Sequence, residues 1–112
     1  MPSDSEWNVL ISYLGGLSAA GGKLKESGTT HWVSPNTGAT NESGFTALPG
    51  GIRTVDGHFN YNFLIDEYWS STAYQSNISW SWDVDMDNLR TGISLWYDIT
   101  ANGYSVRCIS DS

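Results

Sequence analysis

The chain has 112 residues, of which 39% are apolar, and we therefore expect a single domain with one core over residues 1–112. Lysine plus arginine number 5 and aspartate plus glutamate 12, which gives a formal net charge of −7 at pH 7. Binding to nucleic acids or to anionic membranes requires clustered basic residues, so both are excluded as partners. Membrane insertion is also excluded, because no apolar run approaches the roughly 20 residues of a membrane span.

The chain contains one cysteine, Cys108, which excludes a disulfide within the chain and a zinc site of the multi-cysteine type. It lies in an apolar stretch between Val106 and Ile109. Free cysteines in such surroundings are usually small buried hydrophobes. We therefore expect Cys108 to be buried and unreactive.

The first predicted element is a short amphipathic helix. Ser3, Asp4 and Ser5 offer N-cap side chains, and Gly15 with Gly16 ends the pattern. Between these signals apolar residues recur at helical spacing, namely Trp7, Leu10, Ile11 and Leu14. Residues 17–25 are richer in alanine but include two further glycines, so we expect a turn or a broken helix there.

Residues 26–44 are dominated by serine, threonine, asparagine and glycine, which is typical of an ordered loop. Trp32 is predicted to anchor this loop in the core. After Gly44 the period becomes that of strands, with candidates at residues 45–48, 59–63, 68–74, 78–86, 92–99 and 104–109. Because helices precede strands, the predicted fold class is α+β, with an N-terminal helix or helices packed on a small antiparallel sheet with long ordered loops.

Alternate aspartates form the most tempting motif. Asp83, Asp85 and Asp87, followed by Asn88, resemble the start of a calcium loop, but such a loop requires glycine and glutamate where this chain has Asn88 and Ser94. Strand alternation accounts for the same residues, with Trp80, Trp82, Val84 and Met86 on the opposite face. We interpret the segment as a strand with a solvated acidic face and keep calcium as the alternative; no other cofactor is expected.

The sequence offers little for catalysis. His31 and His58 are the only histidines, and neither lies in a GxSxG motif or beside Cys108, so both are interpreted as polar loop residues. Asp66 and Glu67 are adjacent, and adjacent strand residues point to opposite faces. We therefore do not expect these two carboxyl groups to act together as an acid and base pair. We therefore expect a protein that is not an enzyme.

The aromatic content is high, with six tryptophans and six tyrosines. Trp7, Trp69 and Trp80 have apolar neighbours and are predicted to lie in the core. Four other rings, those of Tyr74, Trp96, Tyr97 and Tyr104, lie close to Asn77, Asp98 and Asn102 in the sequence. That mixture is typical of binding surfaces, but strands also favour aromatics for packing, so both interpretations stay open for these four rings.

Several stretches together resemble the Fibrobacter succinogenes major paralogous domain, over nearly the whole chain and in the same order. They are GGLSAAGGKLKE from Gly15, GFTALPGGIR from Gly44, YWSST from Tyr68, SW at Ser79 and SVRCIS from Ser105. The resemblance implies a C-type-lectin-like fold, similar to the variable proteins of diversity-generating retroelements and, more remotely, to formylglycine-generating enzymes. It also implies bacterial surface proteins or phage receptor binders, in which function lies on one variable face.

The chain departs from the sugar-binding and enzymatic relatives in its motifs. It has no EPN or QPD triplet, no WND motif and no paired cysteines. These departures argue against calcium-dependent sugar recognition and against the chemistry of the enzymatic relative. Residues between YWSST and SVRC are rich in asparagine, aspartate, serine and tyrosine, the residue types that adenine-directed mutagenesis installs in retroelement targets. One hypothesis is therefore that this segment is diversified. The alternative is a polar outer strand face that merely tolerates substitution.

We expect a non-enzymatic ligand-binding or adhesion domain, displayed on a cell surface, on a virion or outside the cell, with a protein or glycan ligand. Aromatic anchors ringed by polar groups would supply affinity. The alternatives are a carbohydrate-binding module and a structural surface domain without a ligand of its own. The predicted ligand-binding residues are Tyr74, Asn77, Asp83, Asp85, Asp87, Asn88, Arg90, Trp96, Tyr97 and Asn102.

Overall fold

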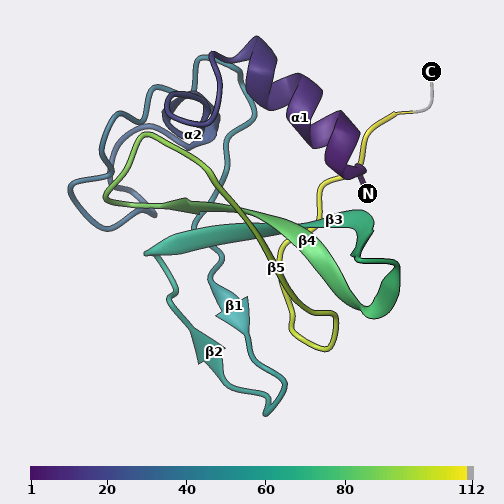
Figure 1. Cartoon of the computed structure of the whole chain (residues 1–112). Helices are drawn as coiled ribbons and strands as arrows, with labels where there is room; N and C mark the ends of the chain where they lie inside the picture. Colours follow the sequence, from purple (N-terminus) through teal and green to yellow (C-terminus); the bar gives the residue numbers. More distant parts are fainter. Residues whose placement is uncertain (111–112) are drawn as a thin grey trace.

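The computed structural model describes residues 1–110, which form a small α+β structure with two antiparallel sheets, as the class predicted from the sequence requires. Figure 1 shows both helices on one side of the central sheet and a short hairpin on the other. The elements are α1 (Asp4–Tyr13), α2 (Ala20–Leu24), β1 (Ile52–Arg53), β2 (Phe59–Asn60), β3 (Ile65–Tyr74), β4 (Asn77–Asp87) and β5 (Ser94–Ile99). Among these residues no helix is both long and apolar enough to cross a membrane.

Helix α1 forms where the sequence predicts it. Its start is a capping box, in which the Ser3 hydroxyl accepts from the Glu6 amide and the Glu6 carboxylate accepts from the Ser3 amide. The following glycines, with φ of 106° at Gly15 and 94° at Gly16, end the helix because they adopt the left-handed region readily. Trp7 and Ile11 point into the core.

Helix α2 confirms the broken helix predicted within residues 17–25. It contains Gly21 and Gly22, which disfavour helix, yet both are buried against neighbouring backbone. A side chain at Gly21 would collide with the carbonyl of Gly92, and one at Gly22 would collide with the carbonyl of Gly38. Close packing therefore requires these glycines, and the helix stays short.

The central sheet has the strand order β3-β4-β5, and its register assigns side chains to two faces. Tyr68 pairs with Val84, and Val84 pairs with Leu95, so these residues share one face. That face packs on the helices, since Tyr68, Val84 and Met86 belong to one buried cluster. The cluster also contains Trp7, Ile11, Leu14, Ala20, Leu24, Trp32, Ala47 and Ile93. The apolar alternation predicted for β4 is thus confirmed at Val84 and Met86.

Three predicted strands are wrong in whole or in part. Residues 45–48 make only a bridge from Ala47 to Lys25, because Thr46 has φ of 55° and interrupts the extended chain. Within residues 59–63 only β2 is extended, since Tyr61 and Phe63 also have positive φ. Residues 104–109 contribute a single bridge from Ser105 to Tyr68 rather than a strand.

Loop 26–44 is anchored as predicted. The Trp32 side chain is 1% exposed, and its indole N–H donates to the carbonyl of Ala47 at 2.9 Å. Beside it lies Lys25, which is fully buried and whose ammonium group is 5.5 Å from the Trp32 ring centroid. These contacts hold a segment with little regular structure against the central sheet.

The prediction that Cys108 is buried is wrong, because its side chain is exposed. After Ser105 the chain leaves the sheet, so residues 106–109 have no strand partner that would bury alternate side chains. Val106 and Ile109 are exposed as well. An apolar run therefore does not mark a buried strand here.

Candidate functional site

Five aromatic side chains gather where β3 turns into β4, and we name them the hairpin-end cluster: Tyr74, Trp80, Trp82, Trp96 and Tyr97. Tyr97 lies at the centre of the cluster. Its ring stacks on Tyr74 at a centroid distance of 3.7 Å and on Trp96 at 5.4 Å. Trp80 and Trp82 meet it edge-on, at 6.2 Å and 5.7 Å. Offset and edge-on contacts of this kind fix the orientation of each ring.

The backbone beside the cluster is a tight turn. Gln75 and Ser76 have φ of 51° and 60°, as in the two-residue turns that match the twist of a hairpin. The turn places Tyr74 opposite Asn77. The β3–β4 register shifts on both sides of Ala73, and such bulges re-aim side chains. The short turn and the bulge therefore fix the position from which the Tyr74 ring stacks on Tyr97.

A shallow pocket of about 260 Å³ opens on this cluster. Its lining consists of Tyr74, Gln75, Asn77, Trp80 and Tyr97. None of these side chains is a carboxylate, a lysine or an arginine, so the pocket combines aromatic faces with two amides. The Trp80 side chain is 37% exposed, and the prediction that it lies in the core is therefore wrong. Trp80 is not a member of the buried cluster beneath the helices.

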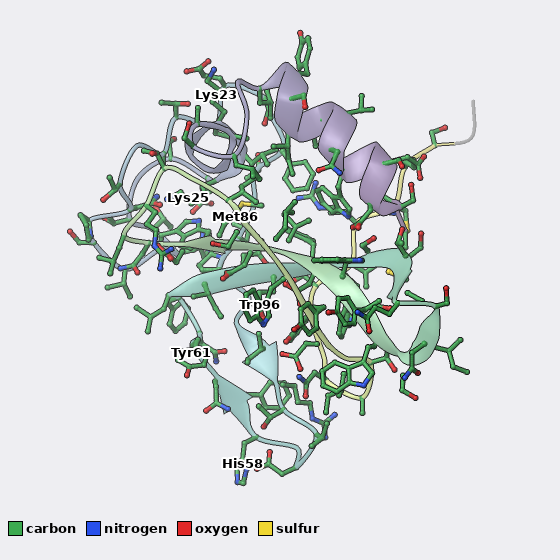
Figure 2. All side chains as sticks on the ribbon, in the orientation of Figure 1. Lys23, Lys25, His58, Tyr61, Met86 and Trp96 are labelled. Carbon is green, nitrogen blue, oxygen red and sulfur yellow. The ribbon has the colours of Figure 1, made fainter. Side chains whose placement is uncertain are left out.

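The face of the sheet away from the helices, from which Trp96 also projects, holds four acidic side chains, which we name the carboxyl cluster: Glu67, Asp83, Asp85 and Asp98. Glu67 pairs with Asp85 across β3 and β4, while Asp83 pairs with Trp96 and Ser81 with Asp98 across β4 and β5. Figure 2 shows Met86 on the helix side of the sheet and Trp96 on the side of the β1–β2 hairpin. The alternation of aspartates therefore places the cluster away from the helices.

The prediction of a solvated acidic face is wrong for Asp83. Its side chain is 1% exposed, and neither carboxylate oxygen has a hydrogen-bond partner. Burial, reinforced by Asp85 and Asp98, raises the pKa of Asp83 to about 7. Burial and the neighbouring aspartates raise the pKa of Glu67 to about 8, and burial with Asp87 raises that of Asp85 to about 6.

The cover over the carboxyl cluster comes from the segment after β5. The Tyr104 hydroxyl donates to a carboxylate oxygen of Asp98 at 2.7 Å, and the Asn102 amide donates to the Tyr104 hydroxyl at 3.4 Å. The Tyr104 ring stacks on Trp69 at 4.3 Å. Asn102 thus serves this cover. Within residues 1–110 no group of three or more His, Cys, Asp or Glu side chains is arranged to hold a metal ion.

The remaining predicted residues lie at the other end of β4. The half-buried Asp87 accepts from the Leu89 amide at 2.8 Å and pairs with the Arg90 guanidinium at 3.2 Å. The buried Asn88 amide donates to the carbonyls of Val33 and Ser34. These side chains hold loop backbone, and β4, with 11 residues, separates them from Asn77 by roughly 30 Å. The ten predicted residues therefore do not form one surface.

The family model of the Fibrobacter succinogenes major domain matches residues 1–110. The chain belongs to this family. No curated protein and no solved structure matches the chain. This match confirms the family membership that the sequence stretches indicated. It covers every helix and strand that the structure describes.

Both histidines of this Fibrobacter succinogenes major domain lie in loops and are exposed. His31 pairs with Glu26 at 2.9 Å. His58 pairs with Asp56 at 2.9 Å, and the Thr54 hydroxyl donates to the same carboxylate, which together lower the pKa of Asp56 to about 2. Because the carboxylate lies between hydroxyl and imidazole, the imidazole is not placed to take the hydroxyl proton.

Sequence reasoning missed one residue of the pocket lining, Gln75, and several members of the two clusters, namely Trp80, Trp82, Glu67 and Asp98. Trp80 and Trp82 alternate with the acidic residues of β4, so their common face was readable from the sequence. Which distant segments cover that face was not readable from the sequence. Glu67 and Asp98 join Asp83 and Asp85 only through the strand register, which no local pattern specifies.

Proposed function

We propose that this Fibrobacter succinogenes major domain is a non-enzymatic ligand-binding domain whose binding site is the pocket of the hairpin-end cluster. The observation that supports this is a pocket of about 260 Å³ that is lined by one exposed tryptophan, two half-buried tyrosines and two exposed amides. Aromatic rings held by neighbouring rings give large contact area at little cost in conformational entropy. Of the predicted ligand-binding residues, Tyr74, Asn77 and Tyr97 line this pocket.

We further propose that the scaffold is C-type-lectin-like and is displayed outside the cell, on a cell surface or on a virion. The arrangement of helices on one side of a small antiparallel sheet, with a long anchored loop, supports this scaffold. In this proposal the side chains at the hairpin end can be substituted, because the backbone of the turn does not depend on them for its hydrogen bonds. That tolerance is what diversification by a retroelement would require of the Tyr74–Asn77 region.

The test is a paired screen of the wild-type chain against an oligosaccharide array and a peptide library displayed on phage. We expect hits in one of the two, and we expect Trp80→Ala to reduce their binding by tenfold or more. Tyr13→Ala is the matched control, because Tyr13 is an aromatic residue of α1 that is 85% exposed and lies outside the pocket. Its binding should equal that of the wild type.

Two outcomes would overturn the proposal. One is the absence of saturable hits in both libraries, which favours a structural surface domain. The other is a set of hits that Trp80→Ala and Tyr13→Ala bind as well as the wild type, since the ligand would then occupy another surface. Circular dichroism of each variant establishes that the fold is retained.

A further inference from the structure

We infer that the hairpin-end pocket binds one uncharged pyranose ring of a glycan, without calcium. This inference rests on the proposed binding function of the same pocket and adds the chemical class of the ligand. A sugar ring has a flat face of C–H groups and an edge of hydroxyl groups. The pocket presents matching features, because rings and amides line it together.

The rings that line the pocket have fixed orientations, and Trp80, the exposed one among them, offers the surface on which a sugar ring can stack. Tyr97 is held between Tyr74 and Trp96, with interplanar angles of 7° and 8°. Trp80 stands at 63° to Tyr97 and closes one side of the pocket. At about 260 Å³ the pocket is slightly smaller than the usual range for small-molecule sites, which begins at about 300 Å³. It therefore suits one ring of a longer ligand.

The amides of Gln75 and Asn77 supply the polar part of the recognition. An amide offers two donors and an acceptor, which suits vicinal hydroxyl groups that both donate and accept. The Asn77 carbonyl oxygen already accepts from the Ser79 amide at 3.0 Å, so its NH₂ group faces a fixed direction. A quaternary ammonium group would use the rings alone, because it neither donates nor accepts hydrogen bonds.

Charge favours an uncharged sugar over an acidic one. The pocket lining contains no lysine or arginine, and the chain has a formal net charge of −7 at pH 7. A uronate, a sialate or a phosphate would be repelled and would find no cationic partner. Uncharged hexoses and N-acetylhexosamines are therefore the expected ligands.

The pocket lining contains no carboxylate that could bind calcium. The acidic residues of β4 and β5 lie on the other face of the sheet, and Asp83 among them is buried. Calcium requires six to eight oxygen ligands, of which carboxylates supply most in proteins. Recognition by stacking and by amide hydrogen bonds requires none, so a chelator should leave binding unchanged.

The experiment uses the full chain and an array of uncharged, acidic and cationic oligosaccharides in buffer with EDTA. We expect binding to an uncharged class of glucose, galactose, mannose or N-acetylglucosamine oligomers. Trp80→Ala should weaken it by tenfold or more, Trp80→Phe by less because a ring remains, and Asn77→Ala by several fold. Tyr13→Ala should have no effect. Titration calorimetry with the best oligosaccharide gives each dissociation constant.

The outcomes separate this inference from the proposed function. Peptide ligands that depend on Trp80, with a blank array, would overturn the glycan inference and leave the binding function standing. Selective binding of acidic or cationic glycans, or loss of glycan binding in EDTA, would overturn it as well. If neither glycans nor peptides bind in a Trp80-dependent way, both the glycan inference and the proposed binding function are overturned.

Discussion

The two ends of the β3–β4 ladder differ in what their backbone requires of the side chains. At the Asp87 end the strands run into loops whose carbonyls lack strand partners, and side chains such as Asn88 donate to them. At the Tyr74 end a two-residue turn joins the strands directly. Because buried backbone groups must be paired, polar side chains beside irregular loops are consumed in holding them. Side chains beside a tight turn stay available for a ligand.

We name the Asp87 end of the ladder the locked end and the Tyr74 end the open end. Lys25 lies at the centre of the locked end. Its ammonium group donates to the carbonyls of Thr37 at 3.0 Å, Asp87 at 2.9 Å and Arg90 at 2.9 Å. Burial lowers the pKa of this lysine, and the nearby Asp87 carboxylate opposes that shift. One side chain thus joins loop 26–44 to the segment after β4.

The largest effect on stability is therefore expected for Lys25→Met. The methionine fills similar space but leaves three carbonyls without a donor, at a cost on the order of 3 kcal/mol in the free energy of unfolding. Urea denaturation followed by tryptophan fluorescence measures the change. Lys23→Met is the control, because Figure 2 shows Lys23 directed away from the sheet while Lys25 lies inside the fold. Equal costs for both variants would contradict the locked-end interpretation.

The carboxyl cluster lies between the two ends and predicts an unusual dependence of stability on pH. The pKa of Asp83 rises from 3.8 to about 7 in the folded chain, and that of Glu67 rises from 4.5 to about 8. The folded chain therefore binds more protons than the unfolded chain between about pH 4 and pH 8. The stabilisation is complete below the unfolded pKa values and is lost as pH rises through the folded ones.

We expect the free energy of unfolding to fall between pH 4 and pH 8 as these buried carboxyl groups ionise. Asp83→Asn removes the charge and should flatten much of this dependence, so that the variant is more stable than the wild type at pH 8. Glu42→Gln is the control, since Glu42 is exposed and outside the cluster. Stability that rises steadily with pH over this range would show that the cluster is solvated after all.

The sequence was most informative where local rules act alone. The capping box of Ser3 and Glu6, the glycines after α1 and the alternation of Val84 with Met86 each follow from spacing. Prediction failed where distant segments decide. Asp83 is buried although its face points away from the helices, Cys108 is exposed because no strand pairs beside it, and Trp80 lies outside the buried cluster. Local periodicity predicts which side chains share one face of a strand, but it does not predict which distant segment covers that face.

The same reasoning explains why the candidate site was only partly predicted. Tyr74, Asn77 and Tyr97 were predicted as ligand-binding residues, and all three line the pocket. Asp87 and Asn88 have the same polar character, but the Asp87 carboxylate pairs with the nearby Leu89 amide and Arg90, and the Asn88 amide donates to carbonyls of the distant loop 26–44. Residue type alone does not distinguish these two roles, because the difference lies in the pairing of the backbone nearby.

The smallest effect is expected at the open end, for Trp96→Ala. The Trp96 side chain is 60% exposed and its ring contact is the stack on Tyr97, so its removal should cost about 0.5 kcal/mol. Tyr97→Ala should cost more, on the order of 2 kcal/mol, because Tyr97 contacts the other four rings of the cluster. Thermal and urea denaturation measure both variants against Lys25→Met. If Trp96→Ala destabilised the chain as strongly as Lys25→Met, the open end would be structural too, and the contrast between the two ends of the ladder would fail.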